Sequence, residues 1–438
     1  MAGHLVSDPV QKQYRTDDLN LKIGPTTFVL KMAFKQEKLD YHYDVQLHAE
    51  SLDFSTLSAL NPEFEKNLPP EAQIKGSSIL TANLSGNKTQ IQTTGFLDFE
   101  KAKIIYGNYF KKGDQVPARI EWSYYGPLDT ILTSGTFKGK MKWQDFFVLE
   151  KYEPENFQAD FHLSGKKMVL DEMSFKLFDG SLLGKGFVDF ENKSPSWQFD
   201  FKAAQIDFNS LMTVTGGFRD IVSGKGDMAL ALSGIGSEMK EIKQSASGDG
   251  NLSVSAGKIS IVNIAKEVLG QSLVDALNLA LTSSAGMGGA PKIAVPRFAM
   301  QTQETNFNSF AGGFRVENGF IQLPDTKIIS ESAVIGLTGK TSLDGDLDLK
   351  GNFLLSRQET DQWLGDFQGK SSLVDSEGKL MVPFTVSGAL TTPLIKPDVS
   401  QWTEKLKGSV IQNLQPKIEE KLPAGIQKST DKLKEIFH

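Results

Sequence analysis

The chain has 438 residues, a formal net charge of −6, 39% hydrophobic residues, 40 glycines and 29 phenylalanines. A charge this small for the length gives no support for nucleic-acid binding, which would need a basic stripe. Cysteine is absent, which excludes disulfides, zinc ribbons, iron–sulfur clusters and thiol catalysis.

The N-terminus does not look like an export signal, because the first twenty residues are polar and include Asp8. A membrane-spanning helix needs about 18 or more consecutive apolar residues. The closest candidate, 261–281, is interrupted by Lys266, Glu267 and Asp275. We therefore expect either a cytoplasmic protein or a chain that lacks its export signal and membrane anchor.

A motif occurs twice along the chain. Leu-Asp-Phe at 52–54 is followed by a helix-like stretch, an alternating strand and Leu-Ser-Gly at 84–86. Ile-Asp-Phe at 206–208 is followed by the same series, which ends in Leu-Ser-Gly at 232–234. A repeat this loose indicates one supersecondary unit that is used several times in an elongated β structure.

Most segments between these motifs alternate apolar and polar residues. Three examples are 157–163, 197–203 and 347–353. Alternation of this kind predicts antiparallel strands with one dry and one wet face. Asn-Gly, Asp-Gly or Gly-Asn pairs separate the strands and predict tight hairpins; they lie at Gly86-Asn87, Asp179-Gly180, Asn318-Gly319 and Asp344-Gly345.

Helices are expected at few places. A short one is predicted at 209–220, and a long one at 261–283, where apolar residues recur on one broad face. The glycine-rich stretch 284–291 ends the long helix. The charged segment 401–438 contains Pro416 and Pro423 and is predicted to form a helical tail.

These patterns predict a mainly β chain: an elongated, curved antiparallel sheet of repeated hairpins with a few short helices. We expect β repeats at 1–195, a second β region at 196–400 that includes the helix near 261–283, and the tail at 401–438.

Candidate catalytic groups are scarce. His42 and His48 share a strand face, but a solvated face is a much better interpretation than a metal site, since no short-spaced ligand pair occurs. Ser85 and Ser164 precede glycines at strand ends, where turn formation explains them. We therefore expect no enzyme activity, no metal and no cofactor.

With catalytic groups set aside, the apolar strand faces are the remaining candidate for a functional surface. In a closed sandwich they would form an ordinary core, whereas in a single curved sheet they would stay exposed and imply a ligand or a partner. Acyl chains would suit such a groove. The residues predicted to line it are Phe199, Phe201, Leu230, Leu232, Leu347 and Leu349; an error of one residue in strand register would reverse every face.

Three segments carry a resemblance to a known family. Met381–Asp398 (MVPFTVSGALTTPLIKPD) resembles the closing signature of the AsmA-like family, an apolar strand with proline, a glycine turn and Pro-x-x-x-Pro-Asp. Leu230–Ile264 is similar to the family's glycine-rich strands before a helix, and Val316–Phe353 is similar to its final strands. The resemblance covers roughly 200–400 well.

The resemblance implies a periplasmic protein of Gram-negative bacteria, anchored in the inner membrane, whose taco-like β groove carries phospholipid acyl chains between membranes. Such a protein would support outer-membrane lipid homeostasis without catalysis, with membranes at the groove ends. Family members begin with a transmembrane helix, and this chain has none, so we expect the intact protein to be longer. The alternative is a structural β sandwich of the envelope that binds another protein, for example through the tail.

Overall fold

The computed structural model describes residues 4–38, 40–56, 71–107, 110–127, 135–148, 153–216, 218–284, 293–365 and 370–400. The predicted fold class is confirmed: the strands form an open antiparallel sheet, and the helices are few and short. The predicted helical tail, 401–438, lies outside the described residues.

The chain divides into two compact units. The first unit comprises residues 1–207, 226–250 and 316–319, and the second comprises 208–225, 251–315 and 320–438. The division predicted after residue 195 therefore falls inside the first unit. Each unit is described separately.

The first unit is almost entirely β. Its strands are β1 (Leu5–Asp8), β2 (Gln13–Ile23), β3 (Thr26–Glu37), β4 (Asp40–Asp53), β5 (Ala72–Gly86), β6 (Gln90–Asp98), β7 (Ala102–Tyr106), β8 (Phe110–Lys112), β9 (Ala118–Pro127), β10 (Thr136–Asp145), β11 (Phe147–Val148), β12 (Glu155–Ser164), β13 (Lys167–Leu177), β14 (Gly180–Asp189) and β15 (Ser196–Asp207). Helix α4 (Met239–Ser245) also belongs to it. Strands β16 (Val222–Ile235), β17 (Ser247–Ile259) and β18 (Thr305–Glu317) contribute residues to both units.

Two sheets share strand β5. In the main sheet the pairing order is β1-β2-β3-β4-β5-β6-β9-β10-β12-β13-β14-β15, and every pair is antiparallel. The first part of β5 instead pairs with β7, which continues through β8 to β11. We call this second set, β5-β7-β8-β11, the small sheet.

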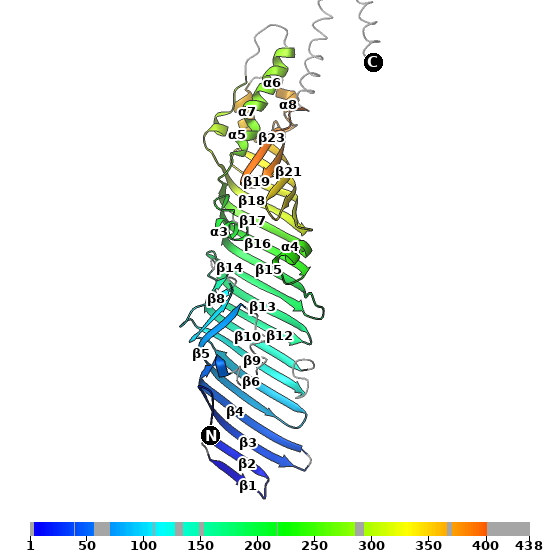
Figure 1. Cartoon of the computed structure of the whole chain (residues 1–438). Helices are drawn as coiled ribbons and strands as arrows, with labels where there is room; N and C mark the ends of the chain where they lie inside the picture. Colours follow the sequence, from blue (N-terminus) through cyan, green and yellow to red (C-terminus); the bar gives the residue numbers. More distant parts are fainter. Residues whose placement is uncertain are drawn as a thin grey trace, which may run out of the picture. The chain divides into compact units, whose positions relative to one another are not determined.

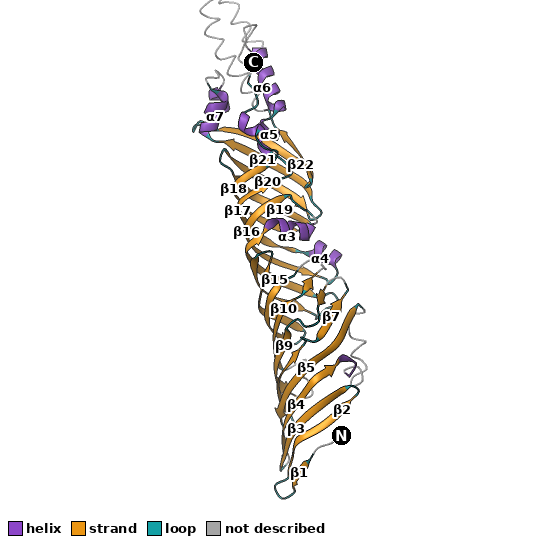
Figure 2. Ribbon diagram, turned by 90° about the vertical axis from the view of Figure 1, so that its left-hand side faces the viewer, coloured by secondary structure: helices purple, strands orange, loops and turns teal. Residues whose placement is uncertain are grey.

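The second unit combines a sheet with helices. Its elements are α3 (Phe208–Gly216), α5 (Ile264–Leu269), α6 (Gln271–Ser284), the 3₁₀ helix η1 (Arg297–Met300), β19 (Phe320–Ile329), β20 (Ala333–Ser342), β21 (Asp346–Leu355), α7 (Arg357–Leu364), α8 (Lys370–Leu373), β22 (Leu380–Ala389) and β23 (Thr392–Pro397). Strands β19 to β23 pair consecutively and antiparallel. Figure 2 shows α5, α6 and α7 grouped within this unit.

The hairpins predicted at Asp179-Gly180 and Asn318-Gly319 are confirmed, with aspartate, asparagine or glycine in the left-handed conformation. Asp179 has a φ of 61° between β13 and β14, and Asn318 and Gly319 have φ values of 52° and 79° between β18 and β19. Glycine and asparagine adopt this left-handed conformation at little cost. The repeated Asp-Phe motif marks a strand end, since β4 ends at Asp53 and β15 ends at Asp207.

The prediction of one long helix at 261–283 is wrong, because two helices occupy this region. Gly270 has a ψ of −166°, an extended conformation that separates α5 from α6. Helix α5 is capped by Asn263, whose side chain accepts a hydrogen bond from the Lys266 amide at 2.9 Å. The short helix predicted at 209–220 is confirmed as α3, with different ends.

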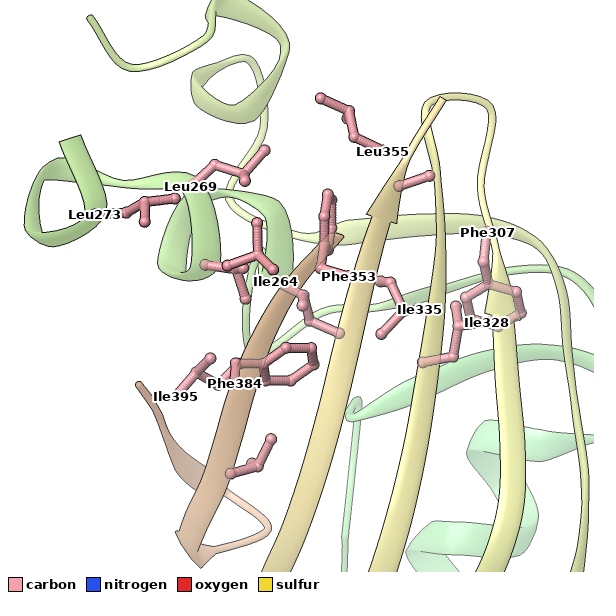
Figure 3. Packing of buried hydrophobic residues seen from close by; sticks show 14 of the residues in the cluster. Ile264, Leu269, Leu273, Phe307, Ile328, Ile335, Phe353, Leu355, Phe384 and Ile395 are labelled. Carbon is pink, nitrogen blue, oxygen red and sulfur yellow. The ribbon is translucent and has the colours of Figure 1, made fainter. Parts of the chain in front are cut away.

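Helices cover the apolar face of the sheet in the second unit. Phe353 and Ile335 are each 1% exposed and lie in one cluster with Ile264 and Leu269 of α5 (Figure 3). The same cluster continues to Phe384 in β22. This face is therefore a closed two-layer core.

Among the helices that the structure describes, none is both long enough and apolar enough to span a lipid bilayer.

Candidate functional site

The strand register of the first unit places apolar residues directly opposite one another on one face of the main sheet. A single line of cross-strand partners runs from β2 to β15. This line, which we call the central row, consists of Leu19, Leu30, Leu47, Ala82, Gly95, Trp122, Gly139, Phe161, Leu170, Gly186 and Phe199. It contains no polar side chain.

A row of similar composition lies on each side of the central row. The first flanking row is Met32, Val45, Leu84, Thr93, Tyr124, Phe137, Leu163, Met168, Val188 and Trp197. The second flanking row is Ala49, Leu80, Leu97, Ile120, Met141, Ala159, Met173, Gly184 and Phe201. The three rows together form what we call the apolar face, and no charged residue belongs to them.

The opposite face of the same strands carries charged pairs, together with some apolar residues such as Val169 and Phe187. Lys140 and Asp160 are direct cross-strand partners there, with 2.9 Å between the ammonium nitrogen and a carboxylate oxygen. Lys185 and Asp200 repeat this arrangement on β14 and β15 at 3.8 Å. The first unit therefore has one wet face and one apolar face, as the alternation of the sequence predicts.

The residues that the structure describes leave the apolar face mostly uncovered. Trp122, Phe161 and Phe199 are only half-buried, and Met168 is 37% exposed. In the second unit, by contrast, the equivalent face is covered by helices, and Phe353 is 1% exposed. A sheet with one apolar face normally buries that face against a second layer, so a continuous uncovered face indicates a binding surface.

The dimensions of the face suit a long, thin apolar molecule. Neighbouring strands lie about 4.8 Å apart, so the ten steps of the central row span roughly 48 Å. Adjacent rows are two residues apart along each strand, or about 7 Å, except at the irregularity between Leu170 and Met173 on β13. The face is thus a strip of three rows that crosses the strands.

One margin of the apolar face is covered by the small sheet. Phe110 of β8 packs against Trp143 with ring centroids 5.0 Å apart, and Phe146 packs edge-on against Trp143 and Phe157. Near them, Ala102 of β7 lies in a buried cluster with Phe54, Phe99 and Ala118. This margin is therefore a local two-layer core.

A buried lysine holds the small sheet together. The Lys112 side chain is fully buried, and its ammonium group donates hydrogen bonds to the carbonyl oxygens of Ala102 at 2.7 Å, Gly113 at 2.9 Å and Glu100 at 3.1 Å. Burial lowers the pKa of Lys112, because the low-dielectric surroundings disfavour the charged form.

The residues predicted to line a groove fall in both units. Phe199 belongs to the central row and Phe201 to the second flanking row, with their rings stacked at 5.7 Å. Leu230 and Leu232 are half-buried on β16 in the first unit. Leu347 and Leu349 lie on β21 in the second unit, where Leu349 is part of the helix-covered core and Leu347 packs against it.

Several residues of the apolar face were not among those predicted. Trp122, Phe161 and Leu170 each occupy the central row. Their place in it follows from strand pairing, which cannot be derived from the sequence alone. The alternation at 157–163 marked Phe161 as lying on an apolar strand face. Only the register shows that this face continues into the neighbouring strands.

In the part of the chain that the structure describes, no group of three or more His, Asp or Glu side chains lies close enough together to hold a metal ion. The imidazole ring of His48 forms hydrogen bonds with the side chains of Thr81 at 3.0 Å and Glu50 at 3.1 Å.

In the second unit, a cleft of about 1150 Å³ lies beside η1 and α7. Its lining mixes apolar residues such as Phe307 and Trp363 with exposed polar residues such as Glu331.

A family comparison agrees with this architecture. Residues 145–326 match the model of the AsmA family. This part of the chain is AsmA-like. The matched region starts upstream of the resemblance predicted from about residue 200, and it ends before the Met381–Asp398 segment. No curated protein sequence matches the chain significantly.

Proposed function

We propose that this AsmA-like protein binds lipid acyl chains on the apolar face of its first unit and passes them along that face without catalysing a reaction. The observation that carries the proposal is the continuous, charge-free and mostly uncovered apolar face, which has the central row at its middle. Phosphate headgroups would remain in water at the margin.

Burial of hydrocarbon supplies the binding energy. Each methylene group removed from water contributes about 0.8 kcal/mol, so an acyl chain needs no specific polar partner on this face. No charged group in the three rows would penalise a chain that shifts from one strand to the next, and every position of the central row presents an apolar side chain or glycine. This uniformity suits transfer better than storage at one site.

The family match supports a role in the cell envelope. We infer a periplasmic protein that is anchored in the inner membrane in its intact form, carries phospholipid and supports outer-membrane lipid homeostasis. The membranes at the two ends of the apolar face would be the donor and the acceptor.

Tryptophan quenching by a brominated lipid tests the proposal. The protein keeps Trp122 and has its other four tryptophans replaced by phenylalanine; a phosphatidylcholine with dibrominated acyl chains is then added. We expect strong quenching of Trp122 fluorescence, and no quenching by the same lipid without bromine, because bromine quenches an indole only in close contact.

A pair of matched substitutions locates the binding. Leu170→Asp places a charge in the central row, whereas Val169→Asp places the same charge on the opposite face of the same strand, where Val169 pairs with His162 and Phe187. Leu170→Asp should abolish the quenching and Val169→Asp should retain it. A folded protein that is never quenched would contradict lipid binding and favour a scaffold role.

A further inference from the structure

The central row contains three glycines that each lie directly opposite an aromatic residue. The cross-strand pairs are Gly95 with Trp122, Gly139 with Phe161 and Gly186 with Phe199. In each pair the aromatic ring occupies the space where a side chain would begin. A Cβ atom on the glycine would lie 2.4, 2.3 and 2.4 Å, respectively, from the nearest ring atom of its partner.

This arrangement keeps large rings close to the backbone. A ring that lies over a neighbouring glycine covers that strand and does not project away from the sheet. From Gly95 to Phe161 the central row therefore alternates bare backbone with rings lying over it, and the same pairing recurs at Gly186 and Phe199 after Leu170. Three positions of the central row therefore lack a side chain of their own and are covered by the ring of the neighbouring strand.

We propose that Gly95, Gly139 and Gly186 are positioning residues for acyl-chain binding: each keeps its partner ring flat, and together they form a lane that holds one hydrocarbon chain perpendicular to the strands. The inference rests on the proposed function. A linear acyl chain is the occupant because the central row is apolar throughout and the two flanking rows lie only about 14 Å apart on either side of it.

Gly139 offers the cleanest test of the three glycines. The three nearest atoms to its missing Cβ all belong to the Phe161 ring, so a methyl group at 139 can be accommodated if that ring swings away from the sheet. At Gly95 and Gly186 a backbone carbonyl oxygen is also within 2.5 Å, from Thr81 and Gln198 respectively. Substitution at those two positions would strain the backbone as well.

The experiment is a double-substitution cycle in the protein that keeps Trp122 alone. Gly139→Ala, Phe161→Leu and both together are titrated with dibrominated phosphatidylcholine. Gly139→Ala should weaken binding about tenfold, because the displaced Phe161 ring enters the lane; tenfold corresponds to about 1.4 kcal/mol. In the Phe161→Leu background the same substitution should change binding by less than about twofold.

Gly180→Ala serves as the control for backbone strain. Its Cβ would lie 2.5 Å from the Ala204 carbonyl oxygen, with no ring among its nearest atoms. We expect Gly180→Ala to lower stability and leave lipid binding unchanged. Equal weakening by Gly180→Ala, or a loss from Gly139→Ala that persists in the Phe161→Leu background, would overturn the proposal.

The remaining outcomes are also decisive. If Gly139→Ala fails to fold alone but folds and binds lipid together with Phe161→Leu, the ring is the cause and the proposal holds. If both proteins fail to fold, the glycine acts on the backbone and the proposal is wrong. A parent protein that is not quenched at all would refute the proposed function itself.

Discussion

Alanine substitutions of Phe353 and Phe161 should lower stability by very different amounts. Both phenylalanines lie on the apolar face of an antiparallel strand, β21 in the second unit and β12 in the first. They differ in what covers them. Phe353 is 1% exposed beneath helix α5, and Phe161 is half-buried on the uncovered apolar face.

The expected magnitudes follow from this difference in burial. Removing a fully buried phenylalanine side chain costs about 3–5 kcal/mol, because a cavity remains in addition to the lost transfer free energy. Full burial of such a side chain contributes about 1.5–3 kcal/mol, so a half-buried ring contributes about 1 kcal/mol. No closed cavity forms at Phe161, since that face opens to solvent.

Hydrogen exchange followed by mass spectrometry measures both effects in one protein, peptide by peptide. Exchange of the amides in β20 to β22 should accelerate about 150-fold or more in Phe353→Ala, and exchange in β10 to β13 about fivefold in Phe161→Ala. Peptides from the unit that carries no substitution serve as the internal reference. Circular dichroism confirms that each variant is folded.

Equal acceleration by the two substitutions would refute the reasoning. If Phe161→Ala lowered stability by about 3 kcal/mol or more, the loss would match that of a sealed core. A second layer would then have to cover the first unit in solution. The lipid-binding proposal would then lose the observation that carries it. Measurement on lipid-free protein is essential, because a bound acyl chain would itself cover Phe161.

The other predictions concern residues that hold the covering layers in place. Asn263→Ala should destabilise the second unit by about 2 kcal/mol, measured by urea denaturation, because it removes the cap of α5 and the hydrogen bonds to the carbonyls of Ala299 and Thr302. Lys112→Met should destabilise the first unit by about 1–3 kcal/mol, since three carbonyls, of which that of Ala102 is buried, lose their donor. The lowered pKa of Lys112 also predicts a pH effect. The unfolded chain binds more protons between that pKa and about 10.4, so stability should rise with pH through this interval. Lys112→Met should remove the rise, and an unchanged pH profile would contradict the assignment.

Local features of this fold were predictable because their causes lie within a few residues. Alternation of apolar and polar residues specifies a strand with two different faces, and glycine or asparagine at positive φ specifies a hairpin. The strand at 197–203 and the turn at 318–319 were both predicted for these reasons. The break at Gly270 was missed, because a single glycine is tolerated within many helices.

The candidate site could be predicted only in part. Phe199 and Phe201 were recognised as lying on an apolar strand face, and they do belong to the apolar face of the first unit. Leu349 has the same local pattern, but it lies in a core that helices cover. Trp122 has alternating neighbours as well, yet its place in the central row depends on its pairing with Gly95 and Gly139.

The sequence by itself determined that this protein is built of antiparallel strands, each with one apolar face, since alternation and turn chemistry act locally. Only the tertiary structure decided which of those faces stays uncovered. Strands β20 to β22 are covered by α5, which is more than sixty residues away in the chain, whereas the described residues place no such layer over most of the first unit's apolar face. Register and coverage depend on pairing between distant segments, and that pairing is what turns similar strands into a sealed core in one unit and an exposed apolar surface in the other.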